Sequence, residues 1–265
     1  MNDYHANIEL SFPLLKETWA NKALRLLVCH PDGAVTPAGR TYAQYLCNLL
    51  DGQLDVGQPD AILDMGQQPV LAPRRHDYDL VIFEESEKPV LKRLLCGPGG
   101  LQATHQCHSP ILIARHPRLP LETILLVTRG QTIDNPAIDW GVRLARPSGA
   151  AVTVLAVQPA LSGLASRALA GAGLADWLTT ETPLGYQLRQ IAGELVDWEI
   201  EGRLRFRDGS PAEQIRHEVG ESEPDLIVIA DDSPNWLMRR VPGPLIGPLL
   251  GWADRPVLVA RSGKG

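Results

Sequence analysis

Short, uninterrupted runs of apolar residues recur along the chain and alternate with longer segments of helical periodicity. Such runs are typical of strands buried on both faces, as in a parallel sheet. We expect strands at Leu26–Val28, Leu80–Phe83, Ile111–Ala114, Leu125–Val127, Val152–Val157, Leu204–Phe206, Leu226–Ile229 and Val257–Ala260. Helices are expected at Ala38–Leu50, Pro136–Arg146 and Leu184–Glu199, and after the capping-box pattern Ser210–Glu213. This alternation predicts an α/β fold, with an open parallel sheet covered by helices on both faces.

The sequence contains an internal repeat. Residues Asp79–Arg115 align with Asp225–Arg261 over 37 positions without a gap, and ten positions are identical. The identical residues of the first copy are Asp79, Leu80, Leu91, Arg93, Gly97, Pro98, Pro110, Leu112, Ala114 and Arg115. The apolar runs that open the two halves, Leu26–Val28 and Leu125–Val127, correspond in the same way. The sequence therefore predicts two tandem copies of one doubly wound α/β unit.

The two copies differ in length. Leu26 to Arg115 spans 90 residues and Leu125 to Arg261 spans 137, so the first copy is 47 residues shorter. Because the shortage lies before Asp79, we expect the first copy to lack the second helix and the loop leading to it. Strands near Leu54 and at Ala61–Met65 are expected there. A short polar connection places the boundary near residue 118, between a truncated domain with an N-terminal extension (1–118) and a complete one (119–265).

Composition and charge exclude several classes of partner. Hydrophobic residues make up 44% of the chain and charged residues 21%, which is ordinary for a globular protein. The net charge is −6 and no run of Lys and Arg occurs. A nucleic-acid groove needs a clustered basic surface, so we expect neither nucleic acid nor an anionic membrane as a partner. Residues 1–20 carry charges and no long apolar run, so we expect no signal peptide or membrane span and a cytoplasmic location.

Candidate catalytic and metal-binding residues are few. The four cysteines lie before residue 110 without a Cys-x-x-Cys pair, and we expect reduced thiols. His105, Cys107 and His108 suggest zinc, but no fourth ligand is in view and we expect no metal site. The sequence has no nucleophile elbow, His-Glu-x-x-His motif, Walker loop or Gly-x-Gly-x-x-Gly fingerprint. We therefore expect a protein that is not an enzyme.

Three stretches of the second half resemble the universal stress protein family. The opening ILLVTRGQTIDNPAIDWGVRLARPSGAAVTVLAV is similar to the family's first strand, helix and second strand. The stretch DGSPAEQIRHEVGESEPDLIVIA is similar to its third strand, helix and fourth strand, and RPVLVAR to its last strand. The resemblance implies the adenine-nucleotide α-hydrolase-like fold and covers most of residues 123–261. In the first half only the opening strand and residues 79–115 match.

The resemblance also implies an ATP-binding loop, Gly-x2-Gly-x9-Gly-(Ser/Thr), after the fourth strand, and an acidic residue after the first. The loop positions read Ala230, Ser233, Gly243 and Pro244 in the second half, and Glu84, Glu87, Gly97 and Pro98 in the first. The acidic position falls on Arg129 and near His30. Proline offers neither N–H nor hydroxyl, and carboxylates in both loops would repel a polyphosphate. We therefore expect degenerate ATP-binding loops, with the first half more altered.

Two functions remain open at this point. The first is a non-enzymatic stress-response or regulatory protein with an unknown protein partner and no cofactor. The second is an adenine-nucleotide-binding protein that uses its second half. Ligands of open parallel sheets lie outside the carboxyl ends of the strands, where strand order reverses. Any ligand is therefore expected in the second half, at Thr128, Arg129, Val157, Ala230, Asp231, Ser233 and Gly243.

The last strand of each copy predicts self-association. The resemblance implies that this strand lies at a sheet edge and pairs antiparallel with its mate in a dimer. Neither Ile111–Ala114 nor Val257–Ala260 contains a charge, and an apolar edge strand left unpaired is an aggregation hazard. We expect the two strands to pair with each other, within one chain, between two chains, or both. The alternative is that a helix covers each edge.

Overall fold

The computed structural model describes residues 23–30, 34–57, 78–85, 109–129, 135–158, 174–231 and 245–261. The elements before residue 118 are β1 (Arg25–Cys29), α2 (Pro37–Leu49), β2 (Gln53–Gly57), β3 (Leu80–Glu84) and β4 (Ile111–Ala114). The elements after it are β5 (Thr123–Thr128), α5 (Asn135–Ser148), β6 (Ala151–Gln158), α7 (Leu174–Thr179), α8 (Pro183–Asp197), β7 (Gly202–Asp208), α9 (Pro211–Ser222), β8 (Leu226–Ala230), α10 (Ile246–Trp252) and β9 (Val257–Ala260). Each strand and helix predicted within these ranges is present.

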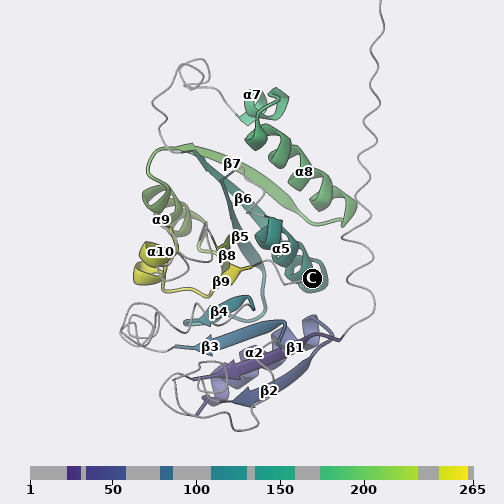
Figure 1. Ribbon diagram of the computed structural model, residues 1–265, viewed down its shortest axis with the longest axis vertical. Coiled ribbons are helices and arrows are strands. Elements are labelled where there is room, and N and C mark those ends of the chain that lie inside the picture. The colour runs from purple at the N-terminus through teal and green to yellow at the C-terminus, as the bar shows by residue number, and fades with distance from the viewer. Residues whose placement is uncertain are drawn as a thin grey trace, which may run out of the picture.

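All described strands form one sheet in the order β2-β1-β3-β4-β9-β8-β5-β6-β7 (Figure 1). Neighbouring strands are parallel except β4 and β9, which are antiparallel, with Leu112 opposite Leu258. The predicted α/β fold with a mainly parallel sheet is therefore confirmed. The last strands of the two halves lie side by side at the centre and join two parallel sheets into one.

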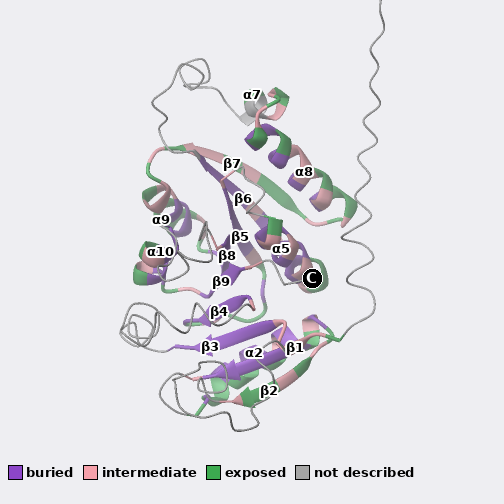
Figure 2. Cartoon of the chain, in the orientation of Figure 1, coloured by how far each residue is buried: buried purple, intermediate pink, exposed green. Residues whose placement is uncertain are grey.

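The sheet separates two apolar cores that both run across the two halves. Residues that alternate along each strand face opposite sides. One side packs against α2, α5 and α8, and the other against α9 and α10 (Figure 1). Figure 2 shows buried residues along the central strands and exposed ones on the edge strands β2 and β7. Because both cores are continuous between the halves, the described part of the chain packs as one body.

The aspartate at the start of each repeat makes an equivalent hydrogen bond in both halves. The Asp79 carboxylate accepts a hydrogen bond of 2.9 Å from the backbone N–H of Arg25 at the start of β1. In the second half the Asp225 carboxylate accepts one of 2.9 Å from the N–H of Thr123 at the start of β5. Each aspartate therefore fixes the start of the first strand of its half beside the strand that follows the aspartate. The repeated aspartate seen in the sequence has this structural role.

Threonine caps begin two of the helices, while the predicted serine cap is incomplete. Thr36 and Thr182 accept hydrogen bonds from the backbone N–H groups of Gly39 and Gly185, with proline at the first helical position. Helix α9 begins after Ser210, as its sequence predicted, but the serine side chain makes no capping bond. The N–H groups of Glu213 and Gln214 bond instead to the Ser210 carbonyl. The expected capping box is therefore wrong in its side-chain bonds.

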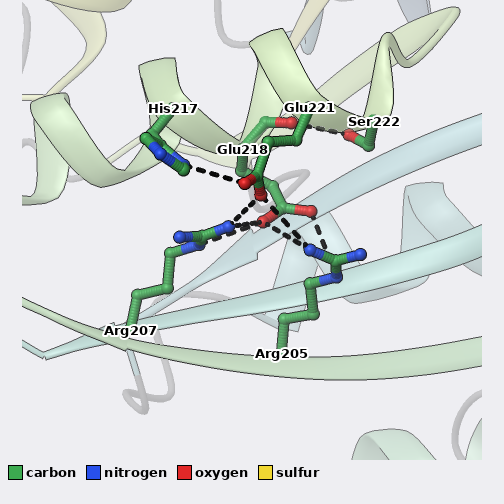
Figure 3. Close-up of polar contacts among 6 residues, drawn as sticks. All are labelled: Arg205, Arg207, His217, Glu218, Glu221 and Ser222. Carbon is green, nitrogen blue, oxygen red and sulfur yellow. Dashed lines mark hydrogen bonds and ion pairs between the residues drawn. The ribbon is translucent and has the colours of Figure 1, made fainter.

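An ion-pair cluster fastens α9 to the edge strand β7 (Figure 3). The Glu218 side chain is fully buried and accepts hydrogen bonds from Arg207, at 3.0 and 2.8 Å. Arg205 reaches both Glu218 and Glu221 at 3.4 Å, and Glu221 pairs with Arg207 as well. Burial alone would lower the pKa of Arg207, but its bonds to the two glutamates raise it above the ordinary value. Arg207 therefore remains charged, and the cluster holds the outer strand against its helix.

We expect Asp139→Asn in α5 to stabilise the protein by about 1 kcal/mol at pH 7, because Asp139 is partly buried and its charge is disfavoured. Burial raises the pKa of Asp139 from 3.8 to about 6; Arg143 lowers it and Glu194 of α8 raises it. The folded state then binds a proton more tightly than the unfolded chain, so stability is lost as pH rises from about 4 to about 6. Urea denaturation across this range should show that slope in the wild type and a flatter profile in the variant. Equal slopes would contradict the assignment.

Candidate functional site

In the second half, the carboxyl ends of the first and fourth strands, β5 and β8, lie next to each other along one edge of the sheet, the edge formed by strand ends. Strand β5 lies between β8 and β6, with Val127 opposite Ile229 and Thr128 opposite Ala156. The ends of β5, β8 and β6 therefore place Thr128, Arg129, Ala230, Asp231 and Val157 along one edge. Ser233 and Gly243, the other two predicted site residues, lie outside the described residues.

Thr128 is tied to a helix that the sequence did not connect with this edge. Thr128 is fully buried, and its hydroxyl donates a 2.9 Å hydrogen bond to the side-chain oxygen of Gln187 in α8. Gln187 is buried as well. A buried amide needs hydrogen-bond partners, so this pair fixes both the strand end and the start of α8. Gln187 is a residue of this edge that the sequence analysis missed, because it is 59 residues from Thr128.

The charged side chains at this edge have partners that the sequence analysis did not assign. Asp231 accepts a 2.8 Å hydrogen bond from Nε of Arg261, which follows β9. Arg129 extends its guanidinium to the carbonyl of Ala230 at 3.5 Å. A paired carboxylate carries little net field, so the described structure gives Asp231 a partner that the sequence analysis did not assign, and the repulsion of a polyphosphate stays a prediction. Two arginines and one aspartate make the described part of this edge net positive.

In the first half a carboxylate occupies the N-terminus of α2. Glu84, at the end of β3, is buried and accepts a 2.7 Å hydrogen bond from the backbone N–H of Thr36. Its other oxygen accepts a hydrogen bond from the Thr36 hydroxyl. The N-terminus of a helix attracts anions through its unpaired N–H groups and its dipole. Here the anion is the protein's own side chain.

Gly39, in the first turn of α2, makes room for this carboxylate. A Cβ atom at Gly39 would lie 2.2 Å from Cδ of Glu84 and 2.4 Å from one of its oxygens. The equivalent position of the second half is Ala137, which packs fully buried in α5, and the residue equivalent to Glu84 there is Ala230. The two halves therefore differ in a matched pair of residues: glutamate with glycine in the first, alanine with alanine in the second.

The neighbouring carboxylate, Glu85, points to the other face of the sheet. It forms a buried ion pair with Arg115, which follows β4, at 2.9 Å. Glu85 and Arg115 are the counterparts of Asp231 and Arg261 in the repeat. The charge of Glu85 is thus neutralised, and only Glu84 of the two presents a carboxylate on the α2 side.

Comparison with known proteins identifies a family for the second half. The model of the universal stress protein family matches residues 120–261, more than half of the chain. The chain belongs to the universal stress protein family. No curated protein matches the sequence significantly. The resemblance inferred from the second half is therefore confirmed.

Solved structures extend the fold match to the first half. A universal stress protein from Archaeoglobus fulgidus DSM 4304 has a TM-score of 0.60 at 14% identity, covering 90% of this chain and 97% of its own. A functionally unknown protein from Pseudomonas aeruginosa PAO1 has a TM-score of 0.55 at 16% identity, covering 91% of this chain and 83% of its own. At this identity the likeness concerns the fold alone. It spans both halves of this universal stress protein.

Several predictions on minor sites fall outside the described ranges. The candidate zinc residues His105, Cys107 and His108 are among them, as are the loop positions Glu87, Gly97 and Pro98. Within the described ranges, no group of three or more His, Cys, Asp or Glu side chains is arranged to hold a metal ion. No helix of the same ranges has the length and apolar character needed to cross a membrane. Cys29 and Cys47, the cysteines within the described ranges, are buried and form no disulfide there.

Proposed function

We propose that this universal stress protein is a non-enzymatic stress-response or regulatory protein whose first half takes no nucleotide. The observation that carries the proposal is the Glu84 carboxylate at the N-terminus of α2. A phosphate group that used the Thr36 N–H and hydroxyl would have to displace a buried, hydrogen-bonded carboxylate. Hydrogen bonds to a charged group contribute about 1.5–3 kcal/mol each, so this displacement is costly. The first half then serves the protein through its packing rather than as a binding site.

The alternative function, adenine-nucleotide binding, is supported only for the second half. Ala230 and Ala137 are small and bring no carboxylate beneath the start of α5. Arg261 is paired with Asp231, so Arg129 leaves the described edge net positive, which favours a phosphate. Against it, Pro244 replaces the family's hydroxyl residue, and Arg129 replaces the acidic residue on the ribose side. We therefore propose that any nucleotide bound is held by the second half alone, at the predicted residues from Thr128 to Gly243.

A nucleotide screen by thermal shift separates the two functions. A ligand at a hundredfold excess over its Kd stabilises the native state by about 2.7 kcal/mol. We expect no shift of the wild-type melting temperature with ATP, ADP or AMP. If one of them does raise it, the alternative holds, and Ser233→Glu should abolish that shift. A shift that survives in Ser233→Glu would contradict both functions as proposed, because the nucleotide would lie elsewhere.

The effect of Gly39→Ala on the free energy of unfolding is expected to have opposite signs in the wild type and in a Glu84→Ala background. In the wild type the added methyl group forces the Glu84 carboxylate out and should cost about 2 kcal/mol in unfolding free energy. In a Glu84→Ala background the same change should stabilise the protein by about 0.5–1 kcal/mol, because alanine is the better helix former. A double-mutant cycle by urea denaturation measures both values. Equal effects of Gly39→Ala in the two backgrounds would mean that Glu84 does not occupy this position.

A further inference from the structure

A tyrosine hydroxyl of α2 is buried where the two halves of the chain meet. Tyr42 is 1% exposed and belongs to the apolar core on the α2 side of the sheet. Its hydroxyl has no hydrogen-bond partner among the described residues. Nearly all buried polar atoms of native proteins are bonded to protein or to ordered water, because an unpaired one costs free energy. The buried hydroxyl therefore indicates a partner other than the described protein groups.

Two further polar side chains lie at the same junction. Tyr45 is on the same face of α2 as Tyr42, three residues on, and its hydroxyl accepts a 3.0 Å hydrogen bond from the backbone N–H of Leu121. The Asp225 carboxylate accepts hydrogen bonds from the next two backbone N–H groups, at 3.1 and 2.9 Å. Burial raises the pKa of Tyr42, and the charges of Asp225 and Tyr45 raise it further. The two hydroxyls and the carboxylate thus converge on one place.

The hydrogen-bonding capacity left at this junction matches one water molecule. Each tyrosine hydroxyl has one proton to donate, and neither proton has an acceptor among the described residues. The bonds that Asp225 accepts there all end on Oδ2, which leaves Oδ1 as an acceptor. A water molecule can accept from both hydroxyls and donate to Oδ1, and three hydrogen bonds are usual for a buried water.

The equivalent junction of the other half is built with a charged side chain. In α5 the position equivalent to Tyr45 is Arg143, and Asp79 is the equivalent of Asp225. Burial lowers the pKa of Arg143, but the negative charges of Asp139 and Asp79 raise it. Asp79 therefore acts on a cation, whereas Asp225 forms no ion pair with any described residue. A water molecule suits the tyrosine junction because it can join hydroxyl protons to a carboxylate without adding a charge.

We propose that one internal water molecule binds between Tyr42, Tyr45 and Asp225. It joins α2 of the first half to the starts of β5 and β8 in the second half. These residues lie at the amino ends of the strands, on the opposite side of the sheet from the carboxyl ends at which a ligand is expected. The water site is therefore separate from the proposed function and does not rest on it.

A crystal structure of the full chain tests the site directly. We expect a water molecule within about 2.5–3.0 Å of both the Tyr42 hydroxyl and Oδ1 of Asp225. A direct hydrogen bond between those two atoms, or a Tyr42 hydroxyl bonded to a protein group outside the described ranges, would overturn the proposal.

Oxygen-17 relaxation dispersion of water makes the same test in solution, because it detects long-lived internal water and does not respond to hydroxyl protons. We expect Tyr42→Phe to lose one such water molecule relative to the wild type. Tyr186→Phe in α8 is the matched control, because Tyr186 is exposed, and it should lose none. Equal numbers of internal waters in the wild type and in Tyr42→Phe would contradict the site.

The stability of Tyr42→Phe separates a bonded hydroxyl from an unbonded one. Removing a bonded hydroxyl should raise the equilibrium constant for unfolding about fivefold, whereas removing an unbonded buried hydroxyl should lower it. Tyr186→Phe should change this constant by less than about threefold, as is usual for surface substitutions. Urea denaturation of both variants measures the two values. A Tyr42→Phe variant more stable than the wild type would mean that the hydroxyl has no partner, which rules out the water.

Discussion

Val259→Pro is expected to destabilise the protein by about 3 kcal/mol or more, whereas Val56→Pro should cost less than about 1 kcal/mol. Both changes place proline in a strand, but the strands differ in their neighbours. Strand β9 lies between β4 and β8 at the centre of the sheet, and β2 lies at its edge. Val259 is buried and Val56 is about half exposed. The difference between the two variants therefore measures how much the pairing of β4 with β9 contributes to the free energy of unfolding.

The two backbone N–H groups that proline would remove differ in direction: one points to a neighbouring strand and the other points away from it. Ile227 and Asp231 of the β8 segment donate to the carbonyls of Pro256 and Ala260, so the even-numbered residues of β9 face β8. The N–H of Val259 therefore points to β4, and its loss leaves a buried carbonyl of β4 without a donor. Gln53 of β2 donates to Leu24, so by the same alternation the N–H of Val56 points away from β1.

Urea denaturation of both proline variants, with light scattering for their association state, makes the measurement. A Val259→Pro variant as stable as Val56→Pro would contradict pairing between β4 and β9. Association with a second chain remains a prediction from the sequence. If the wild type is a monomer by light scattering, pairing within the chain alone accounts for the last strands.

Glu218→Ala is expected to cost about 3 kcal/mol in unfolding free energy, because it removes the fully buried carboxylate that neutralises Arg205 and Arg207. The loss should fall short of that for a fully buried pair. Arg205 is partly exposed and Arg207 retains Glu221, so both guanidinium groups keep some compensation. The effect should appear as earlier urea unfolding, with loss of α9 from the edge strand.

Glu221→Ala is the matched control for this cluster. Glu221 contacts the same two arginines, but its side chain is 47% exposed, and exposed ion pairs contribute at most about 1 kcal/mol. We therefore expect the Glu221 variant to lose less than about 1 kcal/mol. Equal losses in the two variants would mean that burial of Glu218 does not determine the strength of the cluster.

The strands could be predicted because their signal is local. Runs such as Leu226–Ile229 are short and rich in β-branched residues, which favours a buried parallel strand. The ungapped repeat of Asp79–Arg115 in Asp225–Arg261 indicated equivalent units. The apolar edges of the last strands then required a partner. Side-chain hydrogen bonds were harder to predict from the sequence, because each depends on the placement of one side chain. The Ser210 pattern located the start of α9 but not its hydrogen bonds.

The site was predicted less completely because its contacts join distant residues. Glu84 was read as a charge that repels phosphate, while its actual place, at Thr36, is 48 residues away. The partners of Glu85 and Asp231 had a signal that was not used. Both copies of the repeat carry an acid after the strand before the last and an arginine after the last. Since those strands are neighbours in the sheet, the pairing of each acid with its arginine follows from the repeat.

Titration calorimetry of the Ser233→Glu variant with ATP tests the central claim most directly, because a ligand in the second half is blocked and only the first half remains. The account predicts no heat of binding, since the Glu84 carboxylate already accepts the hydrogen bonds of the Thr36 N–H and hydroxyl at the start of α2. A Glu84→Ala change added to this variant opens that position and serves as the comparison. Binding of ATP with micromolar Kd to the chain that carries Ser233→Glu alone would contradict the account.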